Sequence, residues 1–193
     1  SLLRKKVMKY AAQNGLVYIK DTSGTNINVQ IIDTAKLPIS FSTTTTETRP
    51  VLIVMDYAFG EQAFETLDEL LKPYKKSKKN IRFLDVKSVS IMGKAGILEG
   101  GKGDIMLPSA HVFEGTADNY PFKNMLKKSH FEEEEIKVCK GAMITVLGTS
   151  LQNKDILKFF KNSTWNVVGL EMEGAHYQKA IQSASKIRRS ISS

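Results

Sequence analysis

The predicted fold of this chain depends on one stretch, Val167-Val168-Gly169-Leu170-Glu171-Met172-Glu173-Gly174-Ala175. Its apolar run predicts a buried strand, and the two small residues after Glu173 begin the pattern of an amphipathic helix. Glu173 lies on the apolar face of this helix, together with Tyr177, Ala180, Ile181, Ala184 and Ile187. Open α/β sheets bind ligands where their strands end, so Glu171 and Glu173 are candidate binding residues. The alternative is that both carboxylates only offset the positive end of the helix dipole.

The composition predicts a cytoplasmic protein with one main core. The chain has 193 residues, of which 41% are hydrophobic, enough for one sizeable core with an appendage. It has neither an apolar run of the roughly 20 residues that span a bilayer nor the apolar segment of a signal peptide. Cys139 is the sole cysteine, and His111, His130 and His176 lack the spacing of metal ligands. We therefore expect no membrane partner, no metal and no cofactor.

The net charge of +8 raises the question of nucleic-acid binding. Much of the excess lies in one short segment after a predicted helix, with Lys72, Lys75, Lys76, Lys78 and Lys79. Lysines with a single interleaved aromatic residue, Tyr74, are more typical of a solvated loop than of a binding groove. The same charge excess would suit a small anionic ligand equally well. Nucleic acid is therefore not the partner that the sequence favours.

Residues 1–48 form a predicted N-terminal extension, and residues 49–193 form a predicted α/β domain. Leu2–Asn14 reads as a short helix that Gly15 ends. Two β-like runs, 16–20 and 26–32, flank a loop at 21–25 and predict a hairpin. The four threonines at 43–46 precede Pro50 and indicate an extended linker rather than a core element.

From Val51 onward, strands and helices alternate. Val51–Met55 is a continuous apolar run, as expected of a strand covered on both faces. A helix follows, with an apolar stripe that Pro73 ends. The remaining expected elements are strands at 81–84, 86–92, 142–147 and 165–170 and a helix at 155–160. This alternation predicts a central mixed, mostly parallel sheet with helices on both sides.

A glycine-rich segment at residues 93–104 separates two of these strands. Gly96, Gly101 and Lys102 occupy positions of a phosphate-binding loop, but Gly103 replaces the hydroxyl residue that would hold magnesium. A strand-like run follows where that motif requires a helix, so a nucleotide triphosphatase is not expected. We expect instead that the turn at 93–96 exposes backbone N–H groups to a ligand. A tight turn without a ligand is the alternative.

Three segments together resemble the superfamily of nucleoside phosphorylases and methylthioadenosine/S-adenosylhomocysteine nucleosidases. Residues 90–96 with 103–106 resemble the family's strand, its small-residue turn and the Gly-Asp-Ile strand after it. Residues 141–153 resemble the strand and loop that line the base pocket. Residues 168–175 resemble the ribose-binding segment, Glu-Met-Glu followed by a small residue. The match runs from about Val51 to Ile187 and implies a three-layer α/β sandwich.

The resemblance also implies an activity, which is the cleavage of the N-glycosidic bond of a purine nucleoside. Glu173 would accept hydrogen bonds from the ribose 2′ and 3′ hydroxyls, and Met172 would pack against the sugar. Glu61 would position the attacking water, so Glu61 and Glu173 are the candidate catalytic residues. The remaining candidate substrate-binding residues are Gly93, Lys94, Ala95, Gly96, Leu151, Gln152 and Glu171.

The sequence departs from the family in two ways. The loop at 56–60 lacks the arginine that phosphorolytic members use, which favours hydrolysis and leaves phosphate, held by Lys94, as the candidate co-substrate of a phosphorylase. The family also places a catalytic aspartate on a strand after the Glu-Met-Glu helix, and no such strand precedes Ser193. Either the C-terminal part of the domain lies beyond the given sequence, or the chain is a non-catalytic nucleoside- or nucleotide-binding sensor or regulatory domain. Homo-oligomers are expected from the resemblance alone.

Overall fold

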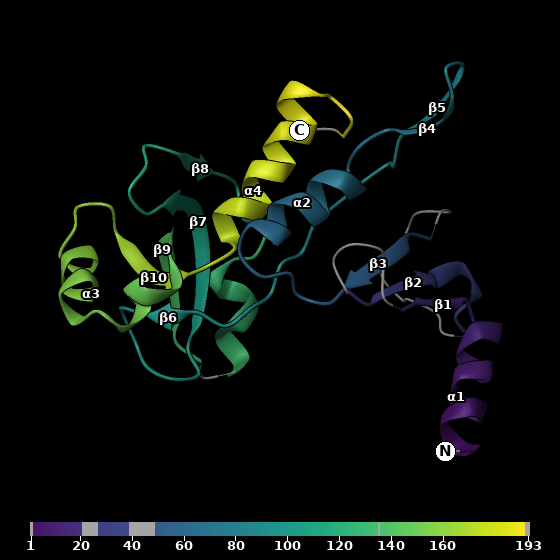
Figure 1. Ribbon diagram of the computed structural model, residues 1–193. Helices are drawn as coiled ribbons and strands as arrows, with labels where there is room; N and C mark the ends of the chain where they lie inside the picture. The colour runs from purple at the N-terminus through teal and green to yellow at the C-terminus, as the bar shows by residue number, and fades with distance from the viewer. Residues whose placement is uncertain (1, 21–26, 39–48, 135, 192–193) are drawn as a thin grey trace. The chain divides into compact units, whose positions relative to one another are not determined.

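A computed structural model describes residues 2–20, 27–38, 49–134 and 136–191, apart from the side chains of 133, 134, 149 and 151. The chain divides into two compact units, Ser1–Ala58 and Phe59–Ser193 (Figure 1). The sequence predicts an earlier boundary, between residues 48 and 49. The predicted hairpin loop at 21–25 and the threonine-rich linker at 43–46 lie outside the described residues.

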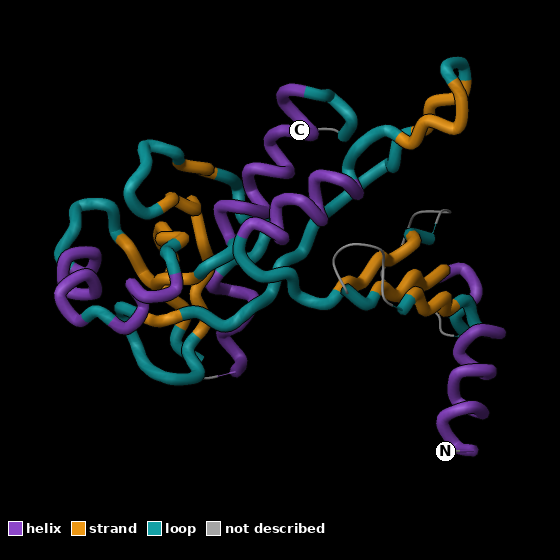
Figure 2. The backbone as a smooth tube through the Cα atoms, viewed as in Figure 1, coloured by secondary structure: helices purple, strands orange, loops and turns teal. Residues whose placement is uncertain are grey.

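The first unit contains a helix and a small antiparallel sheet (Figure 2). Helix α1 (Leu2–Gln13) ends before Gly15, whose φ of +92° is one that glycine adopts without strain. The sheet has the strand order β1-β2-β3 and consists of β1 (Leu16–Ile19), β2 (Val29–Asp33) and β3 (Val51–Met55). A 3₁₀ turn, η1 (Thr34–Lys36), follows β2. The predicted helix and the two predicted strands are thus present.

Strand β3 differs from its prediction as a strand covered on both faces. It is the edge strand of the antiparallel sheet, and four of its five residues are exposed. A continuous apolar run is typical of a buried parallel strand, but the run itself does not specify the strand's partners. Here the partner is β2, along the whole length from Val29 to Asp33.

The second unit is built around a mixed sheet with the strand order β6-β10-β9-β7-β8. The central strands β7 (Ile105–Phe113), β9 (Val138–Thr145) and β10 (Val167–Glu171) are parallel. The edge strands β6 (Gly96–Ile97) and β8 (Asn119–Pro121) are antiparallel to their neighbours. In this register the three parallel strands end side by side, at Phe113, Thr145 and Glu171. The carboxyl edge of the sheet is therefore where a ligand is expected.

Helices lie on both faces of this sheet. On one face α3 (Lys154–Lys161) contributes Phe160 to a core that also contains Val112, Ile144, Val146, Val167 and Leu170. On the other face α4 (Gly174–Gln182) contacts β7, β8 and β9, and α2 (Glu61–Leu70) packs against α4. The π-helical turn η4 (Ser183–Ile187) follows α4, and 3₁₀ helices η2 (Lys128–Glu134) and η3 (Gly148–Gln152) lie between the strands. The mixed α/β sheet is confirmed, whereas the three-layer sandwich stays a prediction.

The segment between α2 and β6 differs from the sequence prediction. Strands β4 (Tyr74–Ser77) and β5 (Asn80–Arg82) form an exposed hairpin that carries four of the five clustered lysines, all but Lys72. The strand predicted at 81–84 is present in part, as β5, whereas the strand predicted at 86–92 is wrong, because 83–95 contains no strand in the described structure. Its β-branched residues favour extended backbone, but no neighbouring strand supplies hydrogen bonds there. No helix in the described residues is long and apolar enough to cross a membrane.

Candidate functional site

Glu171 is the buried centre of a hydrogen-bond network at the carboxyl edge of the sheet. Its Oε2 accepts hydrogen bonds from the backbone N–H of Glu173, at 2.6 Å, and of Gly174. Its Oε1 accepts a hydrogen bond from the Thr145 hydroxyl and lies 3.1 Å from Nδ1 of His111. Both carboxylate oxygens are therefore engaged by the protein itself.

These contacts hold Glu171 in its ionised form. Burial alone would raise its pKa, but the hydrogen bond and the charge of His111, with the hydrogen bonds from Thr145 and Gly174, outweigh burial and lower it. Because an ionised carboxylate only accepts hydrogen bonds, Nδ1 of His111 carries the proton in this contact. The carboxylate also lies at the N-terminus of α4, where the helix dipole favours negative charge.

Glycine is required at position 174 because the imidazole of His111 occupies the space of a side chain. A Cβ built on Gly174 would overlap Nδ1 and Cε1 of that ring and would lie 2.8 Å from Oε1 of Glu171. The ring is itself stacked on Phe122, with centroids 5.6 Å apart and planes 1° from parallel. The small residue after the Glu-Met-Glu segment thus lets β7 and α4 approach each other.

Glu173 is the second buried carboxylate, and α2 begins beside it. The backbone N–H of Gly60, the residue before α2, donates to Oε1 of Glu173 at 3.3 Å. Gly60 has a φ of +54°, and a Cβ there would meet open space. Burial raises the pKa of Glu173, and the charge of Glu171 acts in the same direction, against the hydrogen bond from Gly60. Two carboxylates two residues apart thus have opposite pKa shifts.

The raised pKa of Glu173 predicts a stability difference with a definite sign. Protonated Glu173 is favoured by the fold, so its contribution is present below the pKa of the unfolded chain and is lost as pH rises through the higher folded value. Glu173→Gln mimics the protonated form and still accepts the hydrogen bond from Gly60. We expect the variant to match the wild type at acidic pH and to become the more stable protein as pH rises. Urea unfolding of both proteins at a series of pH values measures this difference, and a variant that becomes less stable than the wild type as pH rises would contradict it.

Glu61 and His176 lie close enough to this site to interact through their charges. Glu61 is the exposed first residue of α2, and His176 lies in the first turn of α4. The His176 ring makes an edge-to-face contact with Phe113, with centroids 4.7 Å apart. Burial lowers the pKa of His176, and the negative charges of Glu61 and Glu171 oppose this only in part. Both predicted catalytic glutamates, Glu61 and Glu173, thus belong to one region.

The glycine-rich turn reaches the same region through β6. Gly96 pairs with Leu170, the residue before Glu171, and the two strands are antiparallel. The chain before Gly96 therefore continues past the carboxyl end of β10. Gly93 and Lys94 are exposed, whereas Ala95 packs against Cys139, Met143 and Val168.

The remaining predicted substrate-binding residues are Met172, Gln152 and Leu151, and none of their described side chains makes a hydrogen bond to either buried glutamate. Met172 packs against the core cluster on the α3 side of the sheet, and a Cβ on Gly148 would lie 3.2 Å from its methyl carbon. Gln152 is exposed at the end of η3. The side chain of Leu151 lies outside the described residues. Their roles in binding stay predictions.

Sequence reasoning did not identify His111, Thr145 and Gly60 as members of this site. His111 and Thr145 lie 60 and 26 residues before Glu171, so no local pattern connects them. A usable signal would have been one polar residue near the carboxyl end of each apolar strand. In the described part of the chain no group of three or more His, Cys, Asp or Glu residues could hold a metal.

Comparison with solved structures defines the fold as that of nucleosidases. A Helicobacter pylori MTAN mutant with 5′-methylthioadenosine in the active site is 14% identical, with a TM-score of 0.57 over 93% of this chain and 76% of that one. A mutant of futalosine hydrolase from Helicobacter pylori strain 26695 is also 14% identical, with a TM-score of 0.55 over 93% and 80%. The 5′-methylthioadenosine/S-adenosylhomocysteine nucleosidase of Neisseria meningitidis, in complex with methylthio-immucillin-A, is 12% identical, with a TM-score of 0.52 over 92% and 74%.

The chain itself belongs to the family described as "Family of unknown function (DUF6909)", which matches residues 2–192. No curated protein matches it. The resemblance in the sequence is thus confirmed at the level of the fold. At 12–14% identity the fold does not define the reaction.

Proposed function

We propose that the α/β unit binds a purine nucleoside through its ribose and cleaves the N-glycosidic bond. The observation that supports this best is the buried carboxylate of Glu173, which lies where the carboxyl edge of the sheet meets the start of α2. A buried carboxylate with a raised pKa has few favourable partners within the protein, so a ligand's hydroxyl groups would stabilise its charge.

The two glutamates of the Glu-Met-Glu segment have different roles in this proposal. Glu171 is a positioning residue, because its Oε2 holds the backbone of Glu173 in place and its Oε1 is bound to Thr145 and His111. Glu173 is the ribose ligand, since one carboxylate can accept both hydroxyls of a cis-diol through charge-assisted hydrogen bonds. The resemblance assigns Met172 to the sugar and Leu151 and Gln152 to the base, and we keep these assignments in the proposal.

The proposed reaction is hydrolysis. The bond between C1′ and the base nitrogen breaks, both electrons leave with the base, and the sugar develops oxocarbenium character. Glu61 positions a water molecule and accepts its proton as the water oxygen bonds to C1′. The negative charge of Glu173 stabilises the developing cation. Lys94 is the residue that would hold phosphate if the reaction were instead phosphorolysis.

A second candidate function is a nucleoside-binding module that does not turn over its ligand. The departing purine needs a proton, and the described ionisable groups beside Glu173 do not readily supply one. Glu171 is kept ionised by its lowered pKa, and burial keeps His176 largely neutral at pH 7. General acid catalysis typically contributes about 10²–10⁴-fold in rate, so a site without an acid would bind rather than catalyse.

The test combines a binding measurement with a product measurement. Adenosine and methylthioadenosine are titrated by calorimetry, and base release is followed by chromatography with and without phosphate. We expect binding that weakens about tenfold or more in Glu173→Gln, since a hydrogen bond to a charged group contributes roughly 1.5–3 kcal/mol. Glu65→Gln, on the exposed side of α2, is the matched control and keeps wild-type affinity.

The ligand supplies a second control. A 2′,3′-dideoxy nucleoside lacks both hydroxyls, so it should bind the wild type as weakly as the parent nucleoside binds Glu173→Gln, and the variant should not distinguish the two. Binding with base release that Glu61→Gln abolishes supports hydrolysis, and binding without base release supports the module. The absence of binding to any nucleoside contradicts both.

Three further expectations accompany this proposal. We infer a cytoplasmic location, a homo-oligomer, and no requirement for a cofactor or for nucleic acid. Light scattering of the purified chain measures the oligomeric state, and a monomer at all concentrations would contradict that part of the proposal. A base-release assay that proceeds after exhaustive dialysis against a chelator would support cofactor independence.

A further inference from the structure

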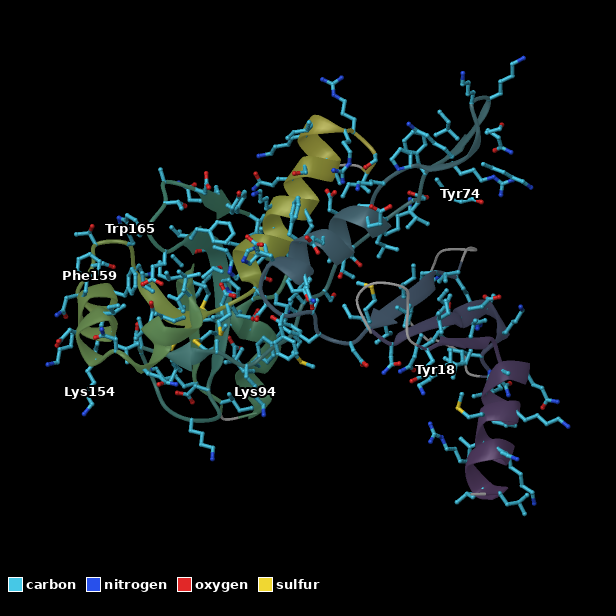
Figure 3. The ribbon with its side chains drawn as sticks, in the orientation of Figure 1. Tyr18, Tyr74, Lys94, Lys154, Phe159 and Trp165 are labelled. Atoms are coloured by element: carbon cyan, nitrogen blue, oxygen red, sulfur yellow. The ribbon has the colours of Figure 1, made fainter. Side chains whose placement is uncertain are left out.

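A pocket of about 820 Å³ lies on the α3 side of the sheet, apart from Glu173. Its wall comes from α3, from the segment after α3 and from the turn that follows β7. Figure 3 labels two of its aromatic residues, Phe159 and Trp165, at this end of the unit. This volume is within the range of small-molecule sites.

Aromatic rings form much of the pocket wall. Phe159 is 69% exposed and Trp165 is 57% exposed, and together with the buried Phe160 and the half-buried Phe113 they line one hollow. Phe159 and Phe160 meet edge to face, with centroids 5.4 Å apart. Large aromatic side chains left exposed around a pocket indicate a recognition surface rather than ordinary solvent-facing positions.

The charge of the pocket is opposite to that of the chain. Among the described residues that line it, the charged ones are Glu114 and Asp155, whereas the chain carries +8 overall. The lysines of α3 (Lys154, Lys158 and Lys161) are exposed and do not line the pocket. An anionic ligand would therefore face two carboxylates at close range.

Glu114 is fixed in position before any ligand arrives. The hydroxyl of buried Ser150 lies 2.8 and 2.7 Å from its two oxygens, and the backbone N–H of Leu147 donates to Oε2 at 3.2 Å. A carboxylate held this way loses little side-chain freedom on binding, which favours affinity. Negative charge held beside several aromatic side chains is an arrangement that attracts organic cations.

We propose that this pocket binds an organic cation of the methylated or quaternary ammonium class. The aromatic faces of Phe159 and Trp165 contact the methyl groups and attract the positive charge, and Glu114 and Asp155 supply opposite charge without requiring an N–H donor. The pocket is larger than a trimethylammonium group, so the natural ligand carries an additional apolar or polar part.

Trp165 is the only tryptophan of the chain, so its fluorescence reports directly on this pocket. The full 193-residue chain is titrated with choline chloride at constant ionic strength, and calorimetry follows the same titration. The neutral control is 3,3-dimethyl-1-butanol, which has the shape of choline without its charge. We expect saturable choline binding that is at least tenfold tighter than binding of the neutral isostere.

Variants assign the binding to named residues. Glu114→Gln and Phe159→Ala should each weaken choline binding about fivefold or more, whereas Glu65→Gln should leave it unchanged. Phe159 is largely exposed, so its loss does not threaten folding. Equal affinity for choline and the isostere, or no saturable binding by either method, overturns the proposal. A mass that rises with protein concentration and falls with Phe159→Ala, without choline binding, would also overturn it in favour of a second copy as occupant.

Discussion

Replacing Glu171 with glutamine is expected to destabilise the α/β unit by about 3 kcal/mol, because it weakens or removes hydrogen bonds to a charged group, which contribute about 1.5–3 kcal/mol each. The two side chains have the same shape, so the effect comes from hydrogen bonding alone. The four groups around the carboxylate are the N–H of Glu173, the N–H of Gly174, the Thr145 hydroxyl and the protonated Nδ1 of His111. With its NH₂ group toward Glu173 and Gly174 the amide faces two N–H donors, and with its NH₂ group toward Thr145 and His111 it is satisfied only if both of these partners accept instead of donate.

The matched control for Glu171→Gln is the same substitution at Glu173. Glu173 accepts hydrogen bonds from the backbone of Gly60 and, more weakly, of Met172, and a glutamine oxygen can still accept the bond from Gly60. We therefore expect two chemically identical changes, two residues apart, to have unequal effects. Glu171→Gln lowers the free energy of unfolding and Glu173→Gln impairs nucleoside binding.

Denaturant unfolding at pH 7 measures the free energy of unfolding of the wild type and of the two variants. Trp165 fluorescence reports on the α/β unit, which contains the site. The pH dependence adds a second check. Because the folded pKa of Glu171 is lowered, its stabilisation is present above the unfolded pKa and is lost as pH falls through the folded value. The difference between wild type and variant should therefore shrink in acid. Equal costs for both substitutions would contradict the assignment of Glu171 as the structural carboxylate.

The elements that could be predicted from the sequence are those whose formation depends on the residues within the element itself. Strands β9 and β10 and helices α3 and α4 are encoded by apolar patterns within their own residues, and the sequence predicts each of them. Strand β3 is a strand as predicted, yet it pairs with β2 and belongs to the first unit rather than to the predicted α/β domain. Pairing is a property of two segments, so a single apolar run predicts an extended backbone without its neighbours.

The candidate site shows the same division. The pattern of the Glu-Met-Glu segment indicates that two carboxylates lie at the end of a strand, but not which of them the protein itself engages. That difference depends on His111 and Thr145, from two other strands, and on Gly60, from the start of α2. The pocket lined by Phe159 and Trp165 was likewise not predicted, because its wall combines α3 with the turn after β7.

Gly174→Ala is expected to destabilise the unit by roughly 3 kcal/mol, although alanine is the better helix former by up to about 1 kcal/mol. Its methyl group would occupy the space of the His111 ring, and overpacking of this kind typically costs about 1–3 kcal/mol. The ring cannot move without leaving its stack on Phe122 and its contact with Glu171. If the ring moves, the loss of its hydrogen bond to the charged Glu171 would cost at most about 1.5–3 kcal/mol more.

A double-mutant cycle separates this clash from a general intolerance of alanine. His111→Ala removes the ring, and in that background Gly174→Ala should cost much less, because only the approach to Oε1 of Glu171, at 2.8 Å, then opposes the gain in helix propensity. Gly101→Ala is the control, since a Cβ there would meet only Asp104 Oδ2 at 4.0 Å. The coupling energy is measured by denaturant unfolding of the four proteins. An equal cost of Gly174→Ala in both backgrounds would mean that the close approach of His111 is not what requires glycine after Glu173.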